Sequence, residues 1–299
     1  MSAPVAALLV EAFTAIPCQG NGAAVVLLPQ PASDTWMQRL ARSLNQSETA
    51  FLLQAPGGWL LRWFTPSCEV PLCGHATLAA LLALQHWGLL EPSSETVFQT
   101  RSGPLPVAME GAMGRIELPA AELHPATAPD YLDRLLTQSL GTGLEAFWHS
   151  AIGYRVGLLP AQADLAALAW SAMELEPAEA QGLVLMQPLQ AASDQPMVMG
   201  LQADYQLRFF APGLGIPEDP VTGSAHALVT PYWLTRTGRS RTVGWQCSPR
   251  PGGMVASVTS SGMICLSGPG SVLWHGRLQL QPDGCSSAAE RWQQLCGNG

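Results

Sequence analysis

Short apolar runs separated by glycine, proline and polar residues recur along the whole chain, and this pattern predicts β-strands joined by turns. The predicted strands cover residues 7–14, 23–28, 50–54, 60–65 and 115–118 in the first part of the chain, and 255–260, 263–267 and 277–280 near its end. Apolar residues at helical spacing, at Trp36, Met37, Leu40 and Leu44, predict a helix between two of these strands. The terminal segment "SAAERWQQLC" predicts a short closing helix.

The hydrophobic pattern also repeats. "LRWFTPSCEVPLCGHATLAALLAL", which starts at Leu61, aligns with "LRFFAPGLGIPEDPVTGSAHALVTPYWL", which starts at Leu207. Upstream, "VVLLPQ" and "FLLQ" align in the same order with "VGLLPA" and "LVLMQ", and the second copy has its own helical pattern at Leu165, Leu168 and Ala169. Four similarities in one order indicate two copies of one unit. The alternative is a single domain with accidental similarity.

Each copy is expected to run strand, strand, helix, strand, strand, and then through a glycine turn into a second helix. The join falls in "PAAELHPATAPD", which is rich in proline and alanine. We therefore expect two α+β domains, residues 1–124 and 125–299, each with a sheet wrapped around a helix. The length of 299 residues, which exceeds the usual size of a single core, agrees with two domains.

Composition excludes several function classes. The net charge is −8, which argues against a nucleic-acid partner. All 14 basic residues are arginine, so chemistry that needs a Schiff-base lysine or a P-loop lysine is excluded. The seven cysteines are an odd number with no signal peptide before them, which indicates reduced thiols in the cytoplasm. The longest purely apolar run, 78–84, is too short to span a membrane.

The two glycine turns are candidate binding features, because a helix start presents unpaired N–H groups and partial positive charge to an anion. The helices follow Gly74 and Gly223. If both starts face a cleft between the domains, they would hold a small acid. In "EDPVTGS", Gly223 would allow close backbone approach, Ser224 would donate to the ligand, and Asp219 would hold or exchange a proton. Alternatively, Thr222 and Ser224 are only helix caps that follow a rigid turn.

Three further polar residues belong to the candidate site. His75 occupies the place of Ser224 in the first copy. Glu48, in "SLNQSETAFLLQ", stands before a buried strand, where desolvation would raise its pKa and suit it to general acid–base catalysis; alone, a Ser47–Glu48 capping turn would explain it equally well. Asn21 lies in "CQGNGAAVV", and the "GNG" in this segment resembles part of a dinucleotide-binding fingerprint. Val25 stands where that fingerprint has its third glycine, so we expect only a tight turn here.

The segments "GNGAAVVLL", "SETAF", "FTPSCEVPLCGHATLAA" and "EDPVTGSAHALVTPYW" together resemble the PhzF family, named for an isomerase of phenazine biosynthesis. The resemblance implies a diaminopimelate-epimerase-like fold, with two pseudo-symmetric α+β domains, each a barrel-like, mostly antiparallel sheet around a central helix. It also implies a homodimer, an interdomain active site, and no metal or other cofactor. Carried over by motif, Glu48 is the acid/base, assisted by His75, Asp219 and Ser224.

The leading hypothesis is therefore a cofactor-independent isomerase that moves a proton between carbons of a small, cyclic carboxylic acid. The substrate-binding residues are expected to be Asn21, Cys73, Gly74, Thr222 and Gly223. A second hypothesis, an amino-acid racemase or epimerase of the same fold, needs two opposed thiols. Cys73 could supply one, since a helix start lowers a thiol pKa, but the second copy offers none. The third is a binding module without catalysis. No Gly-x-Ser-x-Gly elbow occurs, and the spacing of Cys68, Cys73 and His75 fits no standard zinc pattern.

Overall fold

The chain divides into two units whose contacts are mostly internal. The computed structural model describes residues 4–169, 175–190, 195–284 and 286–295. Unit 1 comprises residues 1–117 together with 267–299, and unit 2 comprises residues 118–266. The expected boundary after residue 124 lies close to this division. The expected second half, 125–299, differs at its end, because strand β20 (Gly270–Leu278) pairs antiparallel with β1 (Val5–Ala12) in unit 1.

Unit 1 combines antiparallel and parallel strand pairs. β1 pairs antiparallel with β2, which runs parallel to β3; β3 pairs antiparallel with β4, which runs parallel to β6; and β6 and β8 flank β7 in antiparallel register. The short β5 pairs with β4. The further elements of unit 1 are β2 (Asn21–Leu28), α1 (Asp34–Leu44), β3 (Glu48–Ala55), β4 (Gly58–Phe64), β5 (Glu69–Val70), α2 (Gly74–His86), β6 (Glu95–Thr100), β7 (Gly103–Glu110), β8 (Met113–Leu118) and α6 (Ser286–Gln293).

Unit 2 follows the same succession of pairings. β10 pairs antiparallel with β11, which runs parallel to β12; β12 pairs antiparallel with β15, which runs parallel to β17; and β17 pairs antiparallel with β18. β9 pairs with β10, and β16 with β15. The elements of unit 2 are β9 (Leu123–Ala126), α3 (Asp130–Leu140), β10 (Ala146–Ser150), β11 (Arg155–Leu158), α4 (Pro177–Ala180), β12 (Leu183–Pro188), β13 (Met197–Val198), β14 (Leu201–Gln202), β15 (Tyr205–Ala211), β16 (Ile216–Asp219), α5 (Gly223–Thr237), β17 (Arg241–Gln246) and β18 (Gly252–Val258). Strand β19 (Ile264–Gly268) begins in unit 2 and ends in unit 1.

In each unit, a buried arginine–glutamate ion pair holds the loop that precedes the buried helix. Arg62 of β4 donates from Nε and Nη2 to the two carboxylate oxygens of Glu69, both at 2.8 Å. Arg208 of β15 binds Glu218 in the same way, at 2.7 and 2.6 Å. Both arginines are almost fully buried. Each pair ties a long strand to the short strand that precedes the glycine turn, so the sequence repeat extends to a repeated charge pair.

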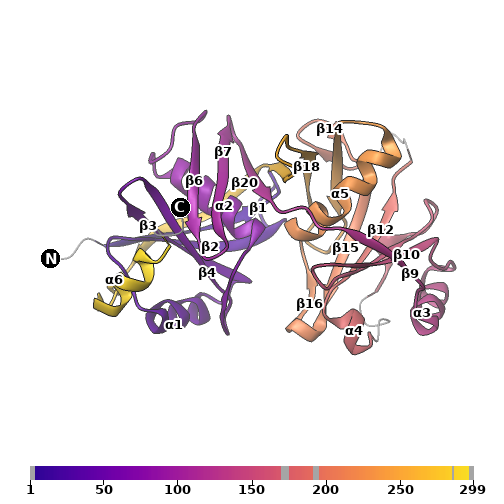
Figure 1. Cartoon of the computed structure of the whole chain (residues 1–299), viewed down its shortest axis with the longest axis horizontal. Helices are drawn as coiled ribbons and strands as arrows, with labels where there is room; N and C mark the ends of the chain where they lie inside the picture. The colour runs from indigo at the N-terminus through magenta and orange to yellow at the C-terminus, as the bar shows by residue number, and fades with distance from the viewer. Residues whose placement is uncertain (1–3, 170–174, 191–194, 285, 296–299) are drawn as a thin grey trace. The chain divides into compact units, whose positions relative to one another are not determined.

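Helices α2 and α5 are apolar on nearly all sides, which is the pattern of a helix surrounded by protein. Residues 75–84 of α2 are all buried, and α2 contacts β1, β2, β3, β7 and β20 (Figure 1). α5 contacts β17 and β18 and ends at Gly238, whose left-handed conformation terminates the helix. No helix among the described residues is long and apolar enough to cross a membrane.

Most predicted elements in unit 1 occur within a few residues of their expected bounds, including the helix at α1 and the final helix at α6; Cys296, the last residue of the predicted closing helix, lies outside the described residues. The helix expected around Leu165, Leu168 and Ala169 is instead a single 3-10 turn at Leu165–Ala167, whose N-cap Asp164 accepts a hydrogen bond from the Ala167 N–H. Helix α3 was not predicted, because its sequence directly follows the proline-rich join.

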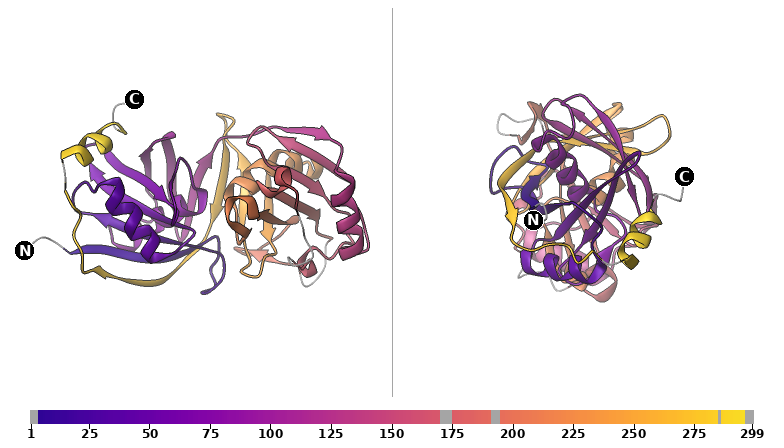
Figure 2. Two further views of the ribbon diagram at one scale, coloured as in Figure 1. Left: turned by 90° about the horizontal axis from the view of Figure 1, so that it is seen from below. Right: turned by 90° about the vertical axis from the view of Figure 1, so that its left-hand side faces the viewer.

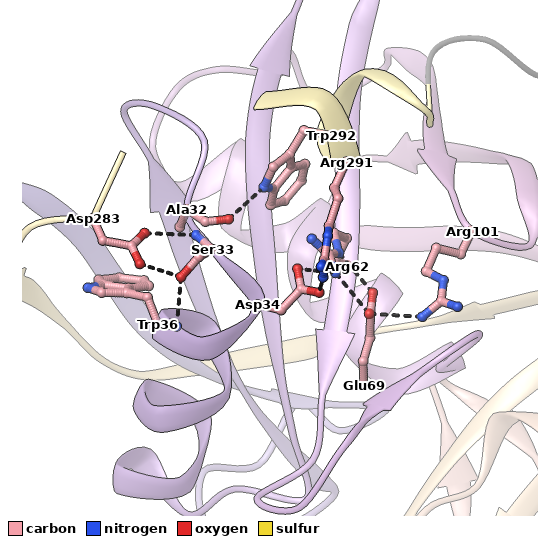
Figure 3. Close-up of polar contacts among 10 residues, drawn as sticks. All are labelled: Ala32, Ser33, Asp34, Trp36, Arg62, Glu69, Arg101, Asp283, Arg291 and Trp292. Carbon is pink, nitrogen blue, oxygen red and sulfur yellow. Dashed lines mark hydrogen bonds and ion pairs between the residues drawn. The ribbon is translucent and has the colours of Figure 1, made fainter. Parts of the chain in front are cut away.

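The C-terminal segment of unit 1 runs back along the N-terminal strand and closes over the start of α1 (Figure 2). Trp292 of α6 donates from Nε1 to the carbonyl of Ala32 at 3.1 Å, and Arg291 forms an ion pair with the first residue of α1 (Figure 3). Asp283 accepts the N–H of Ser33 at 2.8 Å, and the Ser33 side chain caps α1. The last segment of the chain thus completes the core of the first unit.

Candidate functional site

In unit 1, three elements bring the predicted polar residues together. Asn21 and Glu48 are the first residues of the neighbouring parallel strands β2 and β3, so both lie at the same edge of the sheet. Gly20 has φ +70°, which places the expected turn directly before Asn21. Helix α2 begins at Gly74, and its first turn carries His75. The strand starts and the helix start therefore converge on one cluster.

His75 is the centre of this cluster. Its Nε2 lies 3.1 Å from Glu48 Oε2 and 3.1 Å from Ser47 Oγ. Its Nδ1 lies 3.3 Å from the side-chain nitrogen of Asn21 and 3.4 Å from Cys73 Sγ. Ser47 also donates to Asn21 Oδ1 at 3.2 Å. These contacts fix the imidazole beside the Glu48 carboxylate.

The cluster is buried and charged. Burial opposes ionisation of Glu48, but the adjacent positive charge of His75 outweighs it and lowers the pKa of Glu48 below its ordinary value. Burial likewise opposes the charged form of His75, yet its contacts with the Cys73 and Glu48 side chains raise the pKa of His75 well above its ordinary value. At neutral pH the two side chains are therefore a carboxylate and an imidazolium.

This result corrects two expectations. The pKa of Glu48 was expected to rise through desolvation, and it falls because His75 is close enough to neutralise it. The pKa of the Cys73 thiol was expected to fall at the helix start, but burial and the nearby Glu48 carboxylate raise it to about 11. Cys73 therefore stays a neutral thiol at neutral pH.

In unit 2 the predicted residues form a buried turn. Thr222 is the residue before α5, but its side chain caps no helix N–H; its hydroxyl donates to Asp219 Oδ2 at 2.6 Å. Gln246, at the end of β17, accepts the Thr222 N–H at 2.7 Å and donates to the Asp219 carbonyl at 2.6 Å. The neighbouring Glu218, in contrast, belongs to the structural pair with Arg208. The turn is thus held in place by Gln246.

Ser224, in the first turn of α5, contacts the Tyr154 hydroxyl across 3.2 Å. Sequence reasoning missed both Tyr154 and Gln246. The repeat alignment contains a signal for the first, because Tyr154 takes the place of Ala23, two residues after Asn21. Gln246 had no such signal, since its role comes from a strand that joins the turn only in three dimensions.

The structure thus gathers Asn21, Glu48, Cys73 and His75 at the start of α2, with Ser47 added. It gathers Asp219, Thr222 and Ser224 around the start of α5, with Tyr154 and Gln246 added. Gly74 and Gly223 begin the two helices as expected.

Comparisons with known proteins identify the family of the chain. Residues 10–271 match the model of the phenazine biosynthesis-like protein family, PhzC-PhzF. An uncharacterised isomerase of Pseudomonas aeruginosa is 36% identical over 271 residues, which cover 91% of this chain and 97% of that protein.

Solved structures extend the comparison. The crystal structure of a PhzF-family protein of Enterococcus faecalis has a TM-score of 0.79 and 28% identity, covering 93% of this chain and 100% of that one. A hydroxyproline epimerase of Agrobacterium vitis shares the fold alone, with a TM-score of 0.55 and 12% identity over 96% of this chain and 98% of that one. On the extent of these matches, the chain belongs to the PhzC-PhzF family of phenazine biosynthesis-like proteins.

Proposed function

We propose that this protein is an isomerase that moves a proton from one carbon to another within a small carboxylic acid, with Glu48 as the group that carries the proton. The observation that supports this most directly is the buried Glu48–His75 pair. The Glu48 side chain is only 12% exposed, and its Oε2 lies 3.1 Å from His75 Nε2. The same oxygen has no hydrogen bond of regular geometry among the described residues. A buried carboxylate that His75 keeps ionised is suited to act as a general base.

The proposed reaction needs no co-reactant. The Glu48 carboxylate takes a proton from a substrate carbon, and the electron pair of the broken C–H bond moves into the conjugated system of the acid. Glu48, now a neutral carboxylic acid, returns the proton to a different carbon, which regenerates the carboxylate. The product is an isomer of the substrate, so atoms and electrons balance without an oxidant or an organic cofactor.

Each neighbour has a role in this scheme. The His75 imidazolium keeps Glu48 ionised before the reaction, since it lowers the Glu48 pKa, and it stabilises negative charge that develops on the substrate. The Ser47 hydroxyl contacts His75 Nε2 and helps to hold the ring in place. A positioned general base contributes about 10²–10⁴-fold in rate.

The proposal extends to the start of α5. We assign the substrate carboxylate to the N–H groups at Gly223 and Ser224, because the first N–H groups of a helix have no carbonyl partner within it. Asp219 and Ser224 orient the substrate and exchange protons with it.

The racemase hypothesis fares less well on two observations. The residue before α5 is Thr222, whereas the residue before α2 is Cys73, so the second thiol of a two-thiol mechanism has no counterpart there. Burial also keeps Cys73 protonated. A Cys73→Ser variant that retains activity would remove this alternative, and the same variant inactive, with Glu48→Gln active, would establish it.

The proposal is tested by incubating cyclic and unsaturated carboxylic acids with the protein in D₂O and following deuterium incorporation by NMR. We expect the wild type and a Glu110→Gln control, which changes an exposed carboxylate, to exchange the same compound. Glu48→Gln should exchange it about 10²–10⁴-fold more slowly. Equal exchange by Glu48→Gln would refute Glu48 as the base, and ligand-dependent thermal stabilisation without any exchange would point to a binding protein.

A further inference from the structure

The cluster at the start of α2 contains three different metal-ligating groups. One carboxylate oxygen of Glu48, the Cys73 sulfur and one ring nitrogen of His75 all lie within 4.8 Å of one another. They come from separate places, the first residue of β3, the residue before α2 and the first turn of α2. The sequence spacing of cysteines and histidines gave no sign of this set, because Glu48 joins it through the sheet.

Two of the separations are close to those of a tetrahedral zinc site. From ordinary Zn–S, Zn–N and Zn–O bond lengths, ligand atoms around Zn²⁺ stand about 3.3 Å apart for nitrogen and oxygen and about 3.5 Å apart for nitrogen and sulfur. Here His75 Nε2 is 3.1 Å from Glu48 Oε2 and 3.9 Å from Cys73 Sγ. Side-chain rotations that bring the Cys73 sulfur closer to the other two atoms would place all three around one ion.

Burial and charge favour a cation in this place. All three side chains are nearly buried, and the oxygen of Glu48 that faces His75 has no regular hydrogen bond among the described residues. A thiolate and a carboxylate together offset the two charges of a divalent ion. Sulfur and imidazole ligands select zinc-like ions over Mg²⁺ and Ca²⁺, which prefer oxygen. Asn21 lies 3.3 Å from the other ring nitrogen, Nδ1, on the side of the ring where an outer-shell partner would stand.

We propose that Glu48, Cys73 and His75 form a three-ligand site for a thiophilic divalent cation such as Zn²⁺, and that an ion bound there holds the enzyme inactive. Binding exchanges the thiol proton and the imidazolium proton, both released to buffer, for three metal–ligand bonds, and the fourth position is left to water. A metal-bound Glu48 is no longer available to take a proton from carbon. The site itself is independent of the proposed isomerase activity; only the inhibition depends on it.

The test uses Co²⁺ as a spectroscopic probe, because a cobalt–thiolate bond gives a near-ultraviolet charge-transfer band. Cys18 and Cys68 are exposed and could bind Co²⁺ themselves. The host protein therefore carries serine at positions 18, 68, 285 and 296. We expect one Co²⁺ per chain with this band, displaced by Zn²⁺ and not by excess Mg²⁺. Cys73→Ser should abolish the band, and Glu48→Gln should keep it while weakening Co²⁺ binding about tenfold or more.

Two controls separate this site from others. His86 and His275 form an exposed pair with 3.0 Å between Nε2 and Nδ1, so His275→Gln should leave the band unchanged. Cys247→Ala removes a buried thiol elsewhere and should also leave it unchanged. Circular dichroism confirms that each variant is folded, and Cys73→Ala replaces Cys73→Ser if the latter is not.

The absence of a band in the host protein, or a band that persists in folded Cys73 variants, would overturn the proposal. Since these measurements need no substrate, they stand or fall separately from the isomerase activity. Inhibition is tested afterwards: Zn²⁺ should stop deuterium exchange by the host protein, and a chelator should restore it. Zn²⁺ binding at Cys73 with undiminished exchange would contradict the inhibitory role.

Discussion

The buried pair between Arg208 and Glu218 supports a quantitative prediction, because it gives Glu218 a structural role that its neighbour Asp219 does not share. The two side chains are 4% and 10% exposed, and both guanidinium contacts are short. In Glu218→Gln the shape is kept and the negative charge is lost. Arg208 then retains backbone carbonyl partners on Nη1 but no carboxylate.

The expected cost is large. Removal of one partner from a buried ion pair leaves the other charge uncompensated and typically costs about 3–5 kcal/mol. In a unit of this size, each kcal/mol lowers the melting temperature by about 2–4 °C, so we expect a loss of roughly 6–20 °C for unit 2. Glu110→Gln alters an exposed pair and should change stability by about 1 kcal/mol or less.

The assay is urea unfolding of four proteins, the wild type, Arg208→Met, Glu218→Gln and the double variant. We expect the double variant to be less destabilised than the sum of the two single variants, since no lone charge then remains in the interior. Strict additivity, or a loss below about 1 kcal/mol for Glu218→Gln, would refute the assignment of Glu218 to a buried ion pair.

Three further predictions concern other parts of the molecule. Burial lowers the pKa of His226 from 6.5 to about 3, so the unfolded chain takes up a proton on this residue before the folded protein does. The free energy of unfolding is therefore unaffected above pH 6.5 and falls by about 1.4 kcal/mol per pH unit as the pH drops from 6.5 towards 3. Urea unfolding at pH 7 and pH 5 should show this loss, and His226→Gln should lose less; an equal loss would contradict the reasoning. Gln246→Leu should cost about 1–3 kcal/mol, because the Thr222 N–H is left buried and unbonded, and it should raise KM for an active acid; unchanged stability would argue against Gln246 as the anchor. Trp292→Ala should cost about 3–5 kcal/mol and speed hydrogen exchange in α6, whereas exchange at the wild-type rate would show that Trp292 does not fasten this helix to Ala32.

The sequence predicts the local features of this fold well, because they depend on neighbouring residues. The helix starts at Gly74 and Gly223 follow from a glycine turn before an apolar run, and α1 follows from apolar spacing. The repeat alignment also places His75 and Ser224 at matching positions. These signals are sufficient to name most of the side chains that the structure then gathers at the two helix starts.

Features that depend on distant partners were not predictable in the same way. The pKa of Glu48 is lowered by His75, which belongs to helix α2 and not to the strand of Glu48. An argument from the burial of Glu48 alone therefore predicted a raised pKa, which is wrong. Gln246 joins its turn from the end of a later strand. The return of β20 to unit 1 depends on its pairing with β1, which the strand pattern alone does not specify.

The central claim is that one carboxylate both removes and returns the proton. The most direct test is to supply an active acid with deuterium on the carbon that loses hydrogen, in ordinary water, and to measure the label in the product by mass spectrometry. The account predicts that part of the deuterium reappears on the new carbon, and that turnover falls about 10²–10⁴-fold in Glu48→Gln. Undiminished turnover by the folded Glu48→Gln protein would contradict it.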